Sequence, residues 1–414
     1  MKVFKFGGAS LQNAAAIRNM ASIVKSYTDT PLLVVVSAMG KTTNALESIL
    51  NTFVKGGDYQ AEIELLKNYH IRVCEELFGP DHPVSSQLNV LFEELLKKIQ
   101  RPGDYDFVYD QVVSMGEVIS SVVVESQLAS IGLSTAWLDS RNYILTDSTF
   151  REGKVQWKET FEHIAALHPI LQKNIVVTQG FIGATKDGLT TTLGREGSDF
   201  TAAIYASCLQ AESVTIWKDV PGVMSADPKR LPNSVVFTEL PYKEAAEMTY
   251  YGASVIHPKT IQPLALKQIP LLVKSFEDPA LPGTKIHECH IEHLPPLIVF
   301  KENQCLISCK VTDYTFVSEQ QLSIIFQAIS ELDIKINVMQ NSAISFSFCI
   351  DFRESKVMAL INKLQHKFEV YYNTGLTLIT VKNYNEEAFN TYRKKSGVLI
   401  EQSSRSTLQV LLKA

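Results

Sequence analysis

The sequence predicts an α/β protein in which a doubly wound, mostly parallel sheet is followed by smaller α+β modules. Strands that end in glycine-rich loops and lead into helices occur three times within residues 1–210. The strand expected at residues 32–36 (LLVVV) is an unbroken apolar run, typical of a parallel sheet that is buried on both faces. Beyond about residue 280, prolines mark a connector, and the strands and helices that follow repeat in a shorter pattern.

Two strand–loop–helix units open the chain. A strand at residues 3–6 ends at Gly7 and Gly8, and a helix is expected from Ser10 to about residue 27. Strand 32–36 ends in the small-residue loop 37–44 (SAMGKTTN) before the next helix. Further helices are expected within 59–100 and 107–128, and a strand at 136–138. The helix starts should gather at the carboxyl ends of the strands, where open α/β sheets bind ligands.

The third unit runs from a strand at 175–178 through the segment 192–199 (TLGREGSD) into a helix at 199–209. Ser198 is expected to be the N-cap, with Asp199 in the first turn. Glycines in this loop let backbone N–H groups approach an anion, and the fork of Arg195 suits a carboxylate or a phosphate. Taken alone, the segment fits an ordinary capped junction equally well. A strand at 213–217 follows.

The C-terminal pattern is a weak repeat of a small βαββ unit, with a shorter second copy. Strands are expected at 305–312, 334–341, 344–352, 376–383, 398–403 and 407–413, and helices at 319–332, 354–367 and 386–395. We therefore expect a domain at 1–285, a linker at 286–296 and a tandem module at 297–414. The linker contains HECHIEH at 287–293, but its spacing is not that of a zinc helix, which favours a solvated linker.

Composition limits the function classes. A chain of 414 residues is long for one core, so two or three domains are expected. A net charge of −5 and a pI near 6.0 give no electrostatic footprint for nucleic acid. No apolar run reaches the roughly 18 residues of a membrane span, and no signal peptide is expected before the first strand. Six cysteines without CxxC pairing favour reduced thiols and a cytoplasmic protein.

Five ordered motifs resemble those of aspartokinases in the amino acid kinase family. They are KFGGAS at 5–10, VVVSAMGKTTN at 34–44, TLGREGSD at 192–199, VPG at 220–222 with Asp227-Pro228, and Gly252-Ala253 with His257-Pro258. The C-terminal repeat resembles, in architecture only, the paired ferredoxin-like ACT modules of those enzymes. The resemblance implies Mg²⁺- and ATP-dependent phosphorylation of the side-chain carboxylate of L-aspartate, the first step toward lysine, threonine and methionine.

The chemistry of that reaction suits these residues. An aspartate side chain is ionised at neutral pH, so no general base is needed, and catalysis must come from positioning and charge neutralisation. The resemblance implies that Lys5 stabilises the transferring phosphoryl and that Asp199 orients Lys5. It also implies two residue sets. The substrate set is Arg195 for the α-carboxylate, Glu117 for the α-ammonium, and the hydroxyls of Ser37, Thr43 and Ser198; the ATP set is Lys5, Gly7, Gly8, Lys218, Asp219, Met224, Asp227, Lys229 and Ser254.

Alone, each of these residues has an ordinary interpretation. Lys5 would be a solvated charge, and Glu117 a partner of a helix dipole. Several positions also depart from the family pattern, mostly on the nucleotide side. The family usually has Thr at Lys218, Tyr at Met224, Arg at Lys229, Lys at Ser254 and Gly at Glu196. We interpret Lys218 as supplying the charge that Ser254 lacks, and Glu196 as placing a negative charge beside the phosphate loop.

Two other functions remain open from the sequence. One is an amino-acid sensor without turnover, against which the intact set Lys5, Thr43, Glu117, Arg195 and Asp199 argues. The other is a kinase for a different amino acid such as glutamate, against which the KFGG start at 5–8 combined with the ACT-like tail argues.

For the tail we predict homodimerisation, because such modules expose sheet edges that pair. Its candidate effector residues are Asn337, Gln340 and Asn341, but the loop 313–319 contains no glycine and carries two carboxylates. Feedback inhibition is therefore expected to be weak or absent. We expect residues 297–300 to supply the strand that completes the second copy.

Overall fold

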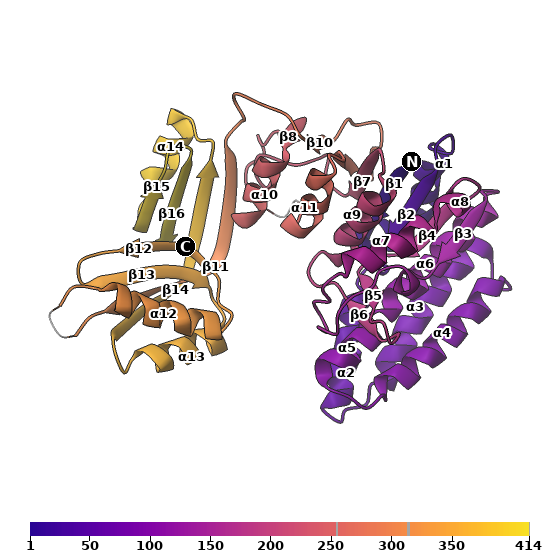
Figure 1. Ribbon diagram of the computed structural model, residues 1–414, viewed down its shortest axis with the longest axis horizontal. Helices are drawn as coiled ribbons and strands as arrows, with labels where there is room; N and C mark the ends of the chain where they lie inside the picture. Colours follow the sequence, from indigo (N-terminus) through magenta and orange to yellow (C-terminus); the bar gives the residue numbers. More distant parts are fainter. Residues whose placement is uncertain (254–255, 313–314, 414) are drawn as a thin grey trace. The chain divides into compact units, whose positions relative to one another are not determined.

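The computed structural model describes residues 1–253, 256–312 and 315–413, which form two compact units (Figure 1). The first unit consists of Met1–Val223, Val236–Ala246 and Ser254–His290. The second consists of Met224–Val235, Glu247–Ala253 and Ile291–Ala414.

The first unit is built on an eight-stranded sheet in the order β3-β4-β2-β1-β7-β9-β10-β8. Neighbouring strands from β3 to β9 are parallel, and β10 is antiparallel to β9, which confirms the predicted doubly wound sheet. The strands are β1 (Lys2–Phe6), β2 (Leu32–Val36), β3 (Thr135–Leu138), β4 (Ile175–Gln179), β7 (Ser213–Lys218), β8 (Glu239–Pro241), β9 (Leu271–Ser275) and β10 (Thr284–His287). β10 extends into the predicted linker because Thr284 and Ile286 alternate as buried residues.

Helices cover both faces of this sheet. Phe4 and Phe6 of β1 share a core with α1 (Ala14–Lys25) and α6 (Met115–Ser130), whereas α9 (Gly197–Leu209) packs on β1 and β7. The remaining elements are η1 (Gly8–Leu11), α2 (Thr42–Val54), α3 (Gln60–Phe78), α4 (Pro83–Ile99), α5 (Tyr105–Val113), η2 (Ser140–Asn142), α7 (Trp157–Ala165), α8 (His168–Leu171), β5 (Ile182–Ala184), β6 (Thr190–Thr192), α10 (Tyr242–Tyr250) and α11 (Pro258–Leu266).

The first predicted helix begins later than expected. Ser10 lies in the 3₁₀ turn η1, and α1 starts after Asn13, whose Oδ1 accepts a hydrogen bond from Ala16 N at 2.9 Å. Asn13 therefore provides the N-cap that the sequence interpretation had not assigned. In the described part of the chain, one stretch, Tyr105–Ser130, is long and apolar enough to cross a membrane, but 94% of its apolar 18-residue window is buried inside the protein. It is a core element.

The second unit contains a six-stranded antiparallel sheet in the order β12-β13-β11-β14-β16-β15. Its elements are β11 (Leu297–Lys310), α12 (Glu319–Glu331), β12 (Ile336–Asn341), β13 (Ser345–Asp351), α13 (Glu354–Leu364), β14 (Glu369–Lys382), α14 (Glu386–Arg393), β15 (Val398–Ser403) and β16 (Thr407–Lys413). The two βαββ copies thus lie in one continuous sheet (Figure 1).

The long strands β11 and β14 are shared by both copies. The first part of β11 pairs with the end of β14, as in Ile298↔Val381, so the predicted contribution of residues 297–300 to the second copy is confirmed. The predicted strand 376–383 is too short, since β14 starts at Glu369 and its first half pairs with the end of β11. Residues 369–375 are almost all exposed, so they carry no alternation that predicts a strand.

Candidate active site

Two glycine-containing loops meet at the carboxyl ends of β1 and β2, which are parallel neighbours. Ser37 N donates to Phe6 O at 3.1 Å, and Gly40 N donates to Gly8 O at 2.9 Å. A Cβ on Gly8 would lie 2.7 Å from the carbonyl oxygens of Ala38 and Gly40, so only glycine allows this approach. The loop after β1 is therefore fixed against the loop after β2.

One buried carboxylate holds two ammonium groups at the same edge of the sheet. Lys5 Nζ on β1 lies 2.6 Å from Asp199 Oδ1, in the first turn of α9. Lys218 Nζ at the end of β7 lies 3.9 Å from Asp199 Oδ2. The Asp199 side chain is 4% exposed, whereas those of Lys5 and Lys218 are 12% and 23% exposed. Both cations keep a face toward solvent, where an anionic ligand can reach them.

The start of α9 differs from the prediction. Ser198 is not the N-cap: Glu196 takes that position with a left-handed φ of +53°, and its carbonyl accepts from Asp199 N and Phe200 N. Because the helix begins at Gly197, Ser198 lies within the first turn and packs on Gly180. The carboxylate of Glu196 accepts a hydrogen bond from His257 N at 2.8 Å, so its charge faces the amino end of α11.

Glu117 lies in the first turn of α6 and is 3% exposed. Its Oε1 accepts from Ala38 N at 3.3 Å, and its Oε2 has no hydrogen-bond partner among the described residues. Burial raises the pKa of Glu117 to about 8, although the Ala38 N–H and the charge of Lys5 act in the opposite direction. A buried carboxyl with one unused oxygen is suited to a cationic ligand group.

Arg195 is exposed and follows Gly194, which has a φ of +76°. In the part of the chain that the structure describes, its guanidinium makes no hydrogen bond or ion pair. Ser37 and Thr43 are half-buried, at the end of β2 and in the first turn of α2. The structure therefore places Lys5 near the end of β1, and Ser37, Thr43, Glu117, Arg195, Ser198 and Asp199 on loops and helix starts, at the carboxyl edge of one sheet.

Sequence reasoning missed His70, a fully buried residue of α3. Its Nδ1 lies 2.8 Å from Leu66 O, and its Nε2 lies 3.2 Å from the hydroxyl of Thr42, the residue before Thr43. The carbonyl can only accept, so Nδ1 carries the proton and Nε2 accepts from Thr42. A single histidine in a helix gives no signal for this contact with the first residue of α2, 28 positions away.

The candidate nucleotide residues fall into separate groups. Lys218 and Asp219 belong to the first unit, whereas Met224, Asp227 and Lys229 belong to the second, where Asp227 Oδ1 accepts from Lys229 N at 2.9 Å. Ser254 lies outside the described residues.

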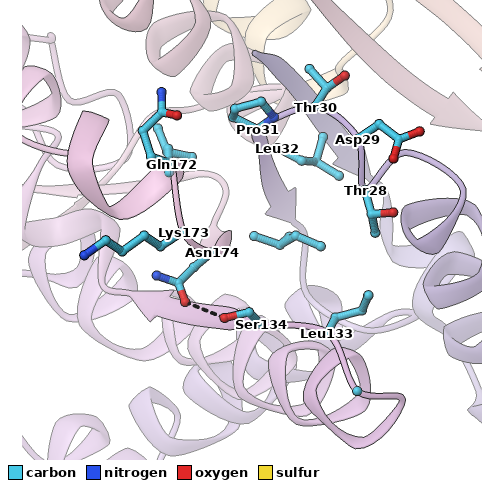
Figure 2. Close-up of a pocket in the computed structure, with 13 residues that line it drawn as sticks. Thr28, Asp29, Thr30, Pro31, Leu32, Leu133, Ser134, Gln172, Lys173 and Asn174 are labelled. Atoms are coloured by element: carbon cyan, nitrogen blue, oxygen red, sulfur yellow. Dashed lines mark hydrogen bonds between the residues drawn. The ribbon is translucent and has the colours of Figure 1, made fainter.

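A cavity of about 420 Å³ lies at the opposite edge of the first sheet (Figure 2). It is lined by residues 28–32, 132–134 and 171–175, which precede or begin β2, β3 and β4. Figure 2 shows Ser134 and Asn174 joined across it by a hydrogen bond of 2.9 Å. None of the candidate site residues lines this cavity, so the candidate active site is elsewhere, at the carboxyl edge.

Residues 1–275 match the family described as the amino acid kinase family. Lysine-sensitive aspartokinase 3 of Escherichia coli K12 is 30% identical over 412 residues, covering 96% of this chain and 90% of the relative. A bifunctional aspartokinase/homoserine dehydrogenase of Buchnera aphidicola is 30% identical over 399 residues, and the chain spans about half (47%) of its length. Solved structures of E. coli aspartokinase III match all of this chain at 27% identity, with TM-scores of 0.84 for the complex with lysine and aspartate and 0.83 for the complex with aspartate and ADP.

Proposed function

The chain belongs to the amino acid kinase family and, within it, to the aspartokinases, and we propose that it transfers the γ-phosphoryl group of ATP to the side-chain carboxylate of L-aspartate. The observation that carries the proposal is the Lys5–Asp199 pair between the glycine loops, with Glu117 unsatisfied nearby. The similarity to E. coli aspartokinase III, whose solved complexes contain aspartate and ADP, supports the same substrates. The product, 4-phospho-L-aspartate, leads toward lysine, threonine and methionine.

In the transfer, a carboxylate oxygen of aspartate forms a bond to the γ-phosphorus while the bond to the bridging oxygen of ADP breaks. The nucleophile is already ionised at neutral pH, so the protein has to neutralise negative charge as two anions meet. Lys5 and Lys218, both held by Asp199, place two positive charges at this point. The N–H groups of Gly7 and Gly8 and the amino end of α9 add fixed dipoles.

Glu117 and Arg195 recognise the part of aspartate that does not react. Glu117 Oε2 is free to pair with the α-ammonium, and Arg195 has its whole guanidinium available for the α-carboxylate. The half-buried hydroxyls of Ser37 and Thr43 supply further hydrogen bonds. A ligand that carries both charges of an α-amino acid satisfies both residues at once.

Mg²⁺ enters this proposal as part of the MgATP substrate. Magnesium is usually held by one or two carboxylates together with nucleotide phosphates. Residues 1–253, 256–312 and 315–413 contain no cluster of three His, Cys, Asp or Glu side chains that could hold a metal without the nucleotide. We further propose a cytoplasmic homodimer, for which the support is six free cysteines and two edge strands, β12 and β15, in the second sheet.

The test is a coupled ADP-release assay with L-aspartate, L-glutamate, N-acetyl-L-glutamate and no amino acid. The expected result is release that depends on aspartate, together with an acyl phosphate that hydroxylamine traps. Faster release with glutamate would indicate a different amino-acid kinase. Binding of aspartate without any release would indicate a sensor. The Lys5→Ala variant is the control for contaminating kinases.

A further inference from the structure

A second buried carboxylate, Asp110 of α5, lies outside the residues assigned above and is fully buried. Its Oδ2 accepts hydrogen bonds from the backbone N–H groups of Arg151 and Thr192, both at 2.9 Å. Its Oδ1 accepts from the Thr192 hydroxyl at 2.7 Å. It makes no ion pair with any residue that the structure describes. Three donors converge on it, and an ionised carboxylate, which only accepts, matches them.

These three bonds fix the chain on both sides of the bend that leads to Arg195. Thr192 ends β6 and is followed by Leu193, Gly194 and Arg195. Arg151 has a left-handed φ of +68°, and its carbonyl oxygen would lie 3.3 Å from a Cβ on Gly194. Asp110 therefore connects the segment at Arg151 to the end of β6 at Thr192. These two segments together determine the position of the turn at Gly194.

The same helical stretch carries Glu117. α5 ends at Val113 and α6 begins at Met115, so only Ser114 separates them. The neighbour of Asp110, Gln111, donates from Nε2 to Thr190 O at 2.8 Å, which adds another bond to β6. Asp110 of α5 is thus bonded to the strand that leads to Arg195, and Glu117, in the first turn of α6, accepts from Ala38 N.

We propose that Asp110 is a positioning residue that sets the spacing between the Arg195 guanidinium and the Glu117 carboxylate, and so the binding of the α-carboxylate and α-ammonium of the substrate. This inference rests on the proposed function, since it concerns the same substrate site. Asp110 acts through the loop 192–195 and does not itself touch the substrate. ATP binding should not depend on it.

The variant that tests this is Asp110→Asn, which keeps the size of the side chain but turns one acceptor into a donor. If the new NH₂ group faces the backbone N–H groups of Arg151 and Thr192, both lose their acceptor; if it faces the Thr192 hydroxyl, that hydroxyl must accept instead and its own proton loses the Asp110 acceptor. Either arrangement leaves a buried donor unpaired, so the loop should shift. We expect KM for aspartate to rise about tenfold or more, while KM for ATP stays within about twofold. Thr192→Val removes one of the three bonds and should give a smaller rise. Combined with Asp110→Asn it should add little, because both changes break the same interaction.

The matched control is Asp106→Asn, one turn earlier on α5, where the carboxylate is 59% exposed and pairs with the Arg151 side chain. Its aspartate KM should be unchanged. The proposal is overturned if Asp110→Asn lowers the melting temperature but leaves KM for aspartate within twofold, or raises both KM values equally. If Asp110→Asn does not fold, the KM values of Thr192→Val for aspartate and ATP are compared in the same way, and a KM for aspartate within twofold of the wild type overturns the proposal. Absence of aspartate turnover in the wild-type protein would count against the proposed function instead, and calorimetry of aspartate binding to both proteins then tests Asp110 directly.

Discussion

At the residue scale, the two charges that we propose for catalysis depend on Asp199, because its two oxygens face Lys5 and Lys218. Lys5 lies at the shorter distance and belongs to β1, the strand that leads into Gly7. Replacing Lys5 with Ala leaves Asp199 near Lys218, so the fold should survive. Turnover should fall by about 10²–10³-fold, the usual effect of removing one group that stabilises transition-state charge.

The measurement is kcat in the coupled assay, with circular dichroism to confirm folding. Lys218→Ala serves as the comparison, and its loss should be smaller because Lys218 lies farther from Asp199. Near-normal kcat in folded Lys5→Ala protein would remove Lys5 from the mechanism.

Glu117 should show opposite effects on stability and on substrate binding. Its pKa is about 8 in the folded protein and near 4.5 in the unfolded chain, so between these pH values the folded state keeps a proton that the unfolded state loses. The stabilisation from this proton is complete below pH 4.5 and disappears as the pH rises through 8. Glu117→Gln remains neutral throughout, so it should exceed the wild type in unfolding free energy by about 2–4 kcal/mol near pH 8.5.

Urea unfolding at pH 5 and pH 8.5 measures this difference, and Glu64→Gln, an exposed site on α3, is the control. The same Glu117→Gln variant should lose aspartate affinity, because an α-ammonium beside Glu117 favours the ionised carboxylate, whereas the amide oxygen can accept a hydrogen bond but cannot become charged. An equal change in unfolding free energy at both pH values would contradict the assignment of a buried, protonated carboxyl.

The motifs predicted the residues that lie close to the glycine loops but not those that support them. Lys5, Glu117 and Asp199 each lie near a helix start or a glycine, so their neighbours in the sequence indicate the role that we propose for them. Asp110 contacts Thr192, which is 82 positions away in the sequence. The sequence around Asp110 shows an ordinary polar residue of a helix and does not predict this contact. Such contacts depend on how the helices pack, and local sequence patterns do not predict that packing.

At the element scale, the existence of the main helices and strands was predictable and their ends were not. α9 starts at Gly197 because Glu196 adopts a left-handed conformation, which Ser198 as an expected N-cap could not reveal. β14 begins seven residues before the expected strand because backbone pairing with β11 holds its exposed first half. Both departures come from tertiary contacts that act against the local pattern.

α3 provides the prediction that belongs to this scale, because His70 ties this helix to the start of α2 through Thr42. Burial lowers the pKa of His70 to about 4, whereas an unfolded chain binds the proton near pH 6.5. Below pH 6.5 the unfolded state gains a proton that the folded state does not, so stability is lost as the pH falls from 6.5 to 4. The wild type should lose about 2–3 kcal/mol of unfolding free energy over this range through His70.

His70→Phe removes this titration and should flatten that part of the profile, while His168→Phe, an exposed residue of α8, should not. Urea unfolding at pH 7, 5.5 and 4.5 gives the comparison. A His70→Phe profile as steep as the wild type would show that His70 is not the group responsible.

At the scale of the whole molecule, the sequence predicted a parallel α/β unit and a repeated α+β unit, and both are present. It could not predict that Met224–Val235 and Glu247–Ala253 are part of the second unit, since no change in composition marks them. The single six-stranded sheet also explains how a shortened second copy is stable. The first residues of β11 form part of the second copy, and its last residues form part of the first copy.

Feedback control is the property that this second unit would govern, and the candidate effector residue Asn337 is already engaged. Its Oδ1 accepts from Lys301 Nζ at 2.9 Å. Its Nδ2 donates to Gln304 Oε1 at 2.7 Å and to Asp351 Oδ1 at 2.9 Å. Gln340 and Asn341 lie exposed on the edge strand β12, and Asp313 and Tyr314 of the preceding loop lie outside the described residues.

Because the amide of Asn337 is satisfied within the protein, an effector would have to break these bonds before forming its own. We therefore predict weak or no inhibition by lysine or threonine, in contrast to a relative named lysine-sensitive. The test titrates each amino acid, alone and together, against the forward reaction at subsaturating aspartate. Half-inhibition at micromolar levels that Asn337→Ala abolishes, and the exposed Asn362→Ala on α13 does not, would identify an effector site here instead. Turnover that stays unchanged as lysine and threonine are added would agree with a second unit in which the Asn337 amide is already fully hydrogen-bonded.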